Sequence, residues 1–197
     1  PEEEKEKVES LQSEFSKFGL FLNDSERMLN TNKDKMKGAL MQSLEDFKNT
    51  VAGRRKKFQQ EGPFDAGLPI KKAFDGINQW RSWIQEDRDN ETKMQAGVDL
   101  FSLDRPVYKD LEAIEKDLGL LQNVWELAQE WNEMWEEWKM GRFTELNVES
   151  MEESSGKFNK KLQKLGKDIK SWKTWEAQKE KVDQFKKALP LITDLRN

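Results

Sequence analysis

The stretch IEKDLGLLQNVWELAQEWNEMWEEW, residues 114–138, carries the strongest structural signal in the chain. Its first half sets apolar residues at spacings of four, three and four: Ile114, Leu118, Leu121 and Trp125. A second apolar row overlaps the first and continues beyond it: Val124, Ala128, Trp131, Trp135 and Trp138. Spacings of three and four keep side chains on one helical face. We therefore expect a helix from about 106 to 139 whose buried face rotates midway, because it meets different neighbours early and late.

Eight tryptophans are unusual in a chain in which 37% of the residues are charged and 35% hydrophobic. Base stacking is disfavoured because glutamates that would repel phosphate lie between the indoles: Glu126, Glu130, Glu133, Glu136 and Glu137. Indoles in a core each bury on the order of 150–250 Å². We therefore expect them to fill a bundle core. The predicted structural core comprises Leu118, Leu121, Trp125, Trp131, Trp135, Trp138, Phe158, Ile169, Trp172 and Phe185.

The same spacing recurs on both sides of this stretch and predicts five more helices. They would cover about 3–29, 33–60, 69–91, a segment from the N-cap Asn147 through Trp172, and a last segment from about Thr174. A turn is expected at LNTNKD (29–34), a loop at EGPFDAGLP (61–69) and another loop at 140–150. Pro190 should kink or break the last helix.

No strand pair or hairpin turn is visible, so the predicted fold class is all-α. We expect elongated antiparallel bundles, with about six long helices in two three-helix units. The best boundary lies in the connector 91–108, which contains Gly97 and Pro106 and whose VDLF (98–101) would dock on the bundle. The expected domains are 1–94 and 95–197.

Composition argues against several kinds of chemistry. Lys+Arg 34 against Asp+Glu 38 gives a net charge of −4, which does not favour a nucleic-acid surface. The chain has no cysteine and no histidine, so thiolate sites, disulfides and the commonest zinc ligand are missing. No apolar run approaches the roughly 18 residues of a membrane span. We predict no catalytic, cofactor-binding or metal site in this chain, and no nucleic-acid or membrane partner.

Three polar motifs have an ordinary structural interpretation. SSGKF (154–158) lacks the upstream glycine of a phosphate-binding loop. RRKK (54–57) is interpreted as a solvated helix face, and EDRDNETKMQAG (86–97) as a solvated helix end. Carboxylate pairs such as EDRD are expected to be solvated too, with no apolar pocket to raise a pKa.

A string of positions over about 95–197 resembles one known family. These positions are Leu100-Phe101; Tyr108, Leu111 and Ile114; Leu118, Leu121 and Trp125; Trp131 and Trp138; Phe143, Leu146 and Met151; Phe185; Leu189-Pro190-Leu191-Ile192; and Leu195-Arg196-Asn197. The pattern resembles the dynein heavy chains where the N-terminal tail passes into the linker. The run 158–175 is more similar to axonemal than to cytoplasmic heavy chains, and an outer-arm chain is the specific expectation.

The resemblance implies a mechanical role. Residues 1–94 would be the last tail bundle and 95–197 the start of the linker, a lever that transmits the ATP-driven stroke of the motor ring for ciliary motility. It implies no cofactor in this segment, because the ATP sites of the family lie elsewhere in the heavy chain. Implied partners are intermediate and light chains, neighbouring heavy chains and docking proteins, in the cytoplasm and the ciliary axoneme.

A second hypothesis is a spectrin-like or plakin-like repeat pair in a cytoskeletal scaffold. Helix length and a unit of about 100 residues fit it, but the Gly/Pro-marked connector 91–108 argues against it, since spectrin repeats usually join through a continuous helix. The chain begins PEEEKEKVES, without Met, and ends LITDLRN in mid-pattern. We therefore expect a piece of a longer protein.

Overall fold

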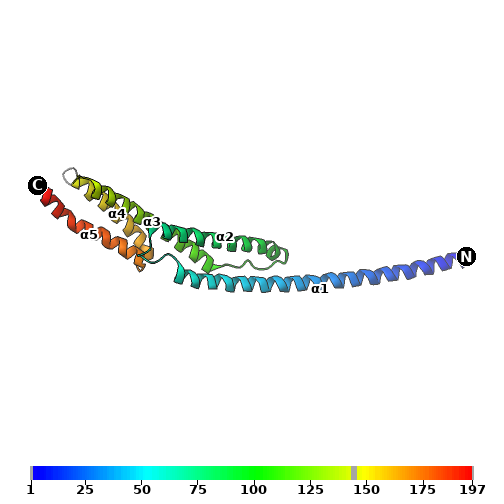
Figure 1. Cartoon of the computed structure of the whole chain (residues 1–197). Helices are drawn as coiled ribbons and strands as arrows, with labels where there is room; N and C mark the ends of the chain where they lie inside the picture. Colours follow the sequence, from blue (N-terminus) through cyan, green and yellow to red (C-terminus); the bar gives the residue numbers. More distant parts are fainter. Residues whose placement is uncertain (1, 143–145, 197) are drawn as a thin grey trace. The chain divides into compact units, whose positions relative to one another are not determined.

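The computed structural model of the chain describes residues 2–142 and 146–196, and these form five helices with no strand among them (Figure 1). The helices are α1 (Glu2–Glu61), α2 (Ile70–Leu100), α3 (Lys109–Met140), α4 (Val148–Ile169) and α5 (Lys173–Arg196). The all-α prediction is confirmed, with five helices in place of about six. Phe143 and Asn197 of the family pattern lie outside the described residues, as do the side chains of Leu195 and Arg196.

The predicted turn at 29–34 is wrong, since α1 runs through it as one helix of 60 residues. The LNTNKD segment contains neither glycine nor proline, and its asparagines and threonine cost only about 0.5 kcal/mol each relative to alanine. Both flanks are already helical, so the helix propagates through the segment without a new nucleation step.

Gly62 ends α1 and opens the first loop. Its amide donates to the Phe58 carbonyl at 2.8 Å, and a Cβ at this position would lie 2.5 Å from the same oxygen. Only glycine lets the backbone approach this closely. The predicted loop at 61–69 is thereby explained, and Pro69 sets up the first turn of α2 by accepting from the Ala73 amide at 3.0 Å.

The predicted connector 91–108 is helical in its first part, because α2 continues to Leu100. Gly97 is tolerated inside the helix because it makes room for Leu40 of α1, whose Cδ2 would lie 2.9 Å from an added Cβ. Of the VDLF segment, Val98 is buried and Leu100 is exposed. The helix ends where the Leu103 amide donates to the Val98 carbonyl at 2.9 Å and Ser102 adopts a φ of 50°.

The predicted N-cap of α4 is confirmed, and the expected break in α5 does not occur. Asn147 is the N-cap as predicted, since its side-chain oxygen accepts from the Ser150 amide at 3.0 Å. Pro190 does not break α5, which continues to Arg196. Proline removes one backbone donor, and the rest of the helix can persist when its apolar face stays packed; Leu189 is buried.

The chain divides into two compact units that cut across the predicted ranges 1–94 and 95–197. One comprises the chain up to Asn49 together with Asn90–Val107, and the other Thr50–Asp89 together with Tyr108 onward. The reason is that α1 and α2 each contribute to both units. Within the second unit, α4 and α5 fold back on one another and both pack against α3 (Figure 1).

An aromatic joint as the candidate functional site

Trp131 of α3 is the centre of an aromatic cluster that also involves α4 and α5. Its ring centroid lies 5.1 Å from that of Phe158 on α4 and 5.4 Å from that of Phe185 on α5, the latter edge to face. A second edge-to-face contact joins it to Trp138 at 6.1 Å. Edge-to-face pairs at these distances are worth about 0.5–1.5 kcal/mol each beyond the area they bury. One indole thus contacts an aromatic ring on each of the two neighbouring helices.

Phe185 is held by three indoles from α3. It stacks on Trp138 at 4.9 Å with 12° between the ring planes, and it meets Trp131 and Trp135 edge to face. These rings recur on α3 because residues 131, 135 and 138 fall within about 60° of one another around a helix. We call Trp131, Trp138, Phe158 and Phe185 the aromatic joint. Their contacts fix α3, α4 and α5 against one another.

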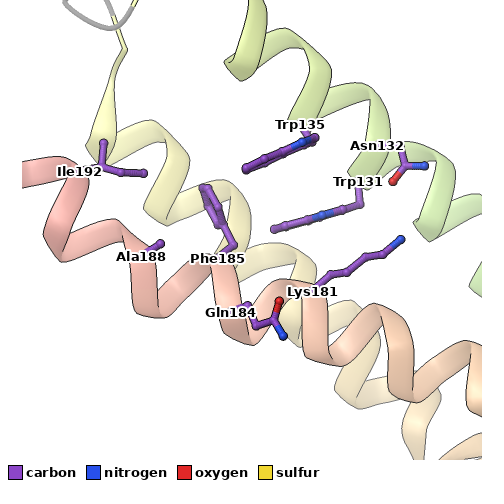
Figure 2. A pocket seen from close by; sticks show the side chains of 8 residues that line it. All are labelled: Trp131, Asn132, Trp135, Lys181, Gln184, Phe185, Ala188 and Ile192. Atoms are coloured by element: carbon purple, nitrogen blue, oxygen red, sulfur yellow. The ribbon is translucent and has the colours of Figure 1, made fainter.

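An open groove lies beside the joint, between α3 and α5. It has a volume of about 450 Å³, and Figure 2 shows Trp135 and Ile192 along it, with Asn132, Lys181 and Gln184 at its polar edge. Trp135 is 44% exposed, so the prediction that it belongs to the core is wrong. Its position on α3 directs the indole toward this groove, where no described side chain covers it fully.

The first half of α3 meets a different set of neighbours. Trp125 donates its indole N–H to the carbonyl of Pro63, in the loop after α1, at 3.0 Å. Phe58 of α1 lies edge to face with Phe64 of the same loop at 5.3 Å and with Trp80 of α2 at 5.1 Å. The buried face of α3 therefore changes neighbours along its length, as predicted from the two overlapping apolar rows.

Two arginines of the RRKK run bind carboxylates of neighbouring helices. Arg54 pairs through two nitrogens with Asp87 of α2, including a 3.0 Å hydrogen bond, and Arg55 pairs with Asp117 of α3 at 2.6 Å. A further bidentate pair joins Arg88 of α2 to Glu115 of α3. The predicted solvated face is therefore wrong for Arg54 and Arg55, whose side chains are only 24% and 20% exposed.

Asp87 corrects a second prediction, because this carboxylate of the EDRD segment is buried and not solvated. Burial raises its pKa above the ordinary value of 3.8, against the opposing attraction and hydrogen bond of Arg54. Desolvation disfavours the charged form of an acid, whereas a cationic partner favours it. The raised pKa means that burial outweighs the ion pair at this position.

The turn between α4 and α5 is locked by a tryptophan that lies on a glycine. Trp175 donates its indole N–H to the Leu162 carbonyl at 2.8 Å, and its ring would lie 2.6 Å from a Cβ at Gly166. Phe64 contacts Trp172 of the same turn edge to face at 5.0 Å. The loop after α1 thus contacts both α3 and the α4–α5 turn.

The other predicted core residues fall into two groups. Five are buried, and of these Phe158 alone belongs to the joint: Leu118, Leu121, Trp125, Phe158 and Ile169. Trp138 and Trp172 are half-buried and pack against the core of α3, α4 and α5. Sequence reasoning missed the contributions of Pro63 and Phe64, because loop contacts leave no periodic signal.

Among residues 2–142 and 146–196, no three or more carboxylate side chains gather in a way that could hold a metal ion. None of the helices in that part of the chain has both the length and the apolar character to cross a membrane.

The fold and the joint define a class: an all-α protein in which long helices are fixed by buried aromatic rings and inter-helix ion pairs. Within that class, residues 111–197 match the family described as "Dynein heavy chain, N-terminal region 2". The chain is 38% identical over 194 residues, 98% of its length, to "Dynein axonemal heavy chain 2" of Mus musculus. It is 35% identical over 196 residues to "Dynein-1-beta heavy chain, flagellar inner arm I1 complex" of Chlamydomonas reinhardtii.

A third relative, "Dynein beta chain, ciliary" of Heliocidaris crassispina, is 29% identical over 147 residues, 73% of this chain. The chain spans only about 4% of the length of the mouse and Chlamydomonas relatives. The chain belongs to the dynein heavy chain family and corresponds to its N-terminal region.

Proposed function

We propose that this chain is a mechanical segment of an axonemal dynein heavy chain, spanning the end of the tail and the start of the linker. It acts as a helical lever that passes ATP-driven displacement from the motor ring toward the tail. The role needs no catalytic side chain here. What it needs is resistance to bending across the point where one group of helices gives way to the next.

The observation that carries this proposal is the double engagement of α3. Its first half is fixed by the Trp125–Pro63 hydrogen bond and the Arg55–Asp117 pair, and its second half by the aromatic joint. All of these contacts lie within one compact unit. A single unbroken helix that is packed against neighbouring elements along both halves transmits force without a hinge, since packed interiors have low compressibility.

The names of the relatives support a setting for this role. The proposed location is the axoneme of a cilium or flagellum, and the proposed partners are intermediate and light chains, neighbouring heavy chains and docking proteins. The expected outer-arm assignment is not confirmed, because a relative aligned along the whole chain is named for an inner arm. We therefore propose an inner-arm heavy chain in place of the outer-arm type.

The test compares motility with ATP hydrolysis in the full heavy chain. Trp131→Ala removes the centre of the joint, so we expect microtubule gliding to slow several-fold while microtubule-stimulated ATP turnover is retained. Glu137→Ala, an exposed change on the same helix, is the matched control. Phe185→Leu tests the same joint with a milder change, in case Trp131→Ala fails to fold. Equal loss of gliding and turnover in a folded variant, or no loss of either, would contradict the lever.

A further inference from the structure

The N-terminal half of α1 presents a long apolar stripe that no described residue covers. Its members repeat every seven residues in two series, and their exposed fractions lie between 50% and 78%: Val8, Leu11, Phe15, Phe18, Leu22, Leu29 and Met36. At 100° per residue they occupy about 80° of the helix circumference. Contiguous apolar surface of this length is uncommon on a free surface and marks a packing interface.

The stripe is continuous with a face of α1 that is packed. Further along the helix, Leu40 and Leu44 are half-buried, and Phe47, Val51 and Phe58 are buried. These residues follow Met36 at spacings of four, four, three, four and seven, which at 100° per residue keep them within the same 80° of the helix circumference as the stripe. Residues 8–36 are therefore the uncovered part of one apolar face whose later part is packed, and we call this uncovered part the seam.

The width of the seam indicates how many helices cover it. Phe21 and Met28 are 66% and 65% exposed and lie on one flank of the stripe, which widens it to about 160°. Two apolar positions in every seven residues suit a two-stranded coiled coil, whereas three apolar positions in every seven suit a helix packed against two others. The middle of the seam thus fits a pair of helices.

A second copy of this chain is a poor occupant because of the flanking charges. In an antiparallel pair centred on the seam, Lys7 would face Lys35 and Lys5 would face Lys33. In a parallel pair Lys7 would face Gln12 and Glu14 would face Gly19. Neither arrangement sets opposite charges across the seam, although such pairs usually choose the partner. The lysines at both ends instead favour a partner with acidic residues there.

We infer that residues 8–36 of α1 bind two amphipathic helices from another part of the same heavy chain, with acidic residues facing the lysines at 5, 7, 33 and 35. The same polypeptide has room to supply these helices, since this chain covers only about 4% of the length of its relatives. A covalently attached partner also has a high effective concentration. The inference rests on family membership and not on the lever, so either can fail without the other.

Photo-crosslinking in the full heavy chain tests the occupant. Benzoylphenylalanine replaces Phe15 or Phe21 on the seam, with Ser13 and Asp24 on the opposite exposed face as matched positions. We expect the seam positions to crosslink to two distinct amphipathic segments of the same heavy chain, outside residues 1–197. Crosslinks to the seam of a second copy, to residues 50–197, to a different subunit, or no more crosslinking than at Ser13, would each overturn the inference.

Amide exchange supplies a second readout. In the full heavy chain, Phe18→Glu should accelerate exchange of residues 8–36 by about tenfold or more, because an introduced carboxylate destabilises the covered seam. Ser13→Glu, on the opposite face, should not. In the isolated chain the same Phe18→Glu should change exchange of this segment little. Equal exchange in the full heavy chain with and without Phe18→Glu would mean that the seam is bare there, which contradicts the inference.

Discussion

Helices α3–α5 and the N-terminal half of α1 are built from the same amphipathic spacing but differ in what surrounds their apolar faces. Trp131 is 4% exposed, with aromatic rings from two other helices around it. Phe15, at an equivalent seam position of α1, is 78% exposed. Periodicity therefore determines which face of a helix is apolar, and the presence of neighbours determines whether that face is buried. The stability of the chain should accordingly be concentrated in the first region.

The largest effect should come from the centre of the joint. Trp131→Ala leaves a cavity among three helices and should lower the free energy of unfolding by about 3–5 kcal/mol. Trp135→Ala removes an indole that is already partly solvated, so the loss should be about 1–2 kcal/mol or less. Urea unfolding followed by circular dichroism measures both. Equal losses for the two variants would mean that Trp135 is buried in solution and would erase the contrast within α3.

A smaller loss is expected when the buried ion pair is broken. Asp87→Ala leaves Arg54 without its carboxylate, and because Arg54 retains some access to water the cost should be about 2–4 kcal/mol. The exposed pair Asp24–Arg27 of α1 provides the comparison, with side chains 73% and 81% exposed. Asp24→Ala should cost at most about 0.5 kcal/mol. Similar losses at both sites would show that burial does not separate these pairs.

Two glycines of α4 should respond in opposite directions to alanine. Gly166→Ala drives a methyl group into the Trp175 ring, and the expected net loss is about 1–2 kcal/mol. Gly156→Ala enters open space on the same helix and should stabilise it by about 0.5–1 kcal/mol. Thermal melts of the pair provide the measurement. A gain from both substitutions would show that Trp175 can move away without loss.

The smallest effect is a pH dependence carried by Asp87. Its pKa is higher in the folded state than the ordinary 3.8, so the folded protein binds more protons between the two values. The free energy of unfolding contributed by this group therefore falls as pH rises from about 3.8 through the raised folded pKa. The stability of the wild type minus that of Asp87→Asn should decrease over this window in urea unfolding.

Glu153 provides a control of opposite sign for that measurement. It is fully exposed, and a hydrogen bond and the charge of Lys157 lower its pKa. The contribution of Glu153 to the free energy of unfolding is present above its ordinary pKa and is lost as pH falls through its lowered pKa in the folded state. The free energy of unfolding of the wild type minus that of Glu153→Gln should therefore not decrease as pH rises. If the unfolding free energy of the wild type minus that of Asp87→Asn instead increased as pH rises, the ion pair with Arg54 would outweigh burial.

The sequence predicts the helical class, the bounds of α3 and the Asn147 cap because each depends on local spacing or on one side chain. It predicts Trp131 and Phe185 as core residues, but it cannot separate them from Trp135, four residues along the same face. That distinction depends on where α5 leaves the groove open. Asp87 was mistaken for a solvated acid, since its partner Arg54 is distant in sequence and the pairing depends on how α1 and α2 meet.

The turn expected at 29–34 failed for a related reason. A three-helix unit within residues 1–94 would require α1 to fold back, and the polar segment LNTNKD is interpreted from sequence as the turn that allows it. The structure keeps α1 continuous and leaves the stripe uncovered by the described residues. The apolar pattern shows which face of α1 is apolar, but it does not determine which helices would cover that face.

Amide hydrogen exchange on the isolated chain tests the central contrast most directly. We predict that the amides around the joint in α3, α4 and α5 exchange only through global unfolding. Those of residues 8–36 should exchange about a thousandfold or more faster, because few buried contacts hold that half of α1. Comparable protection in the two regions, or faster exchange around Trp131 than around Phe15, would contradict the conclusion that the aromatic joint is the rigid part of this chain.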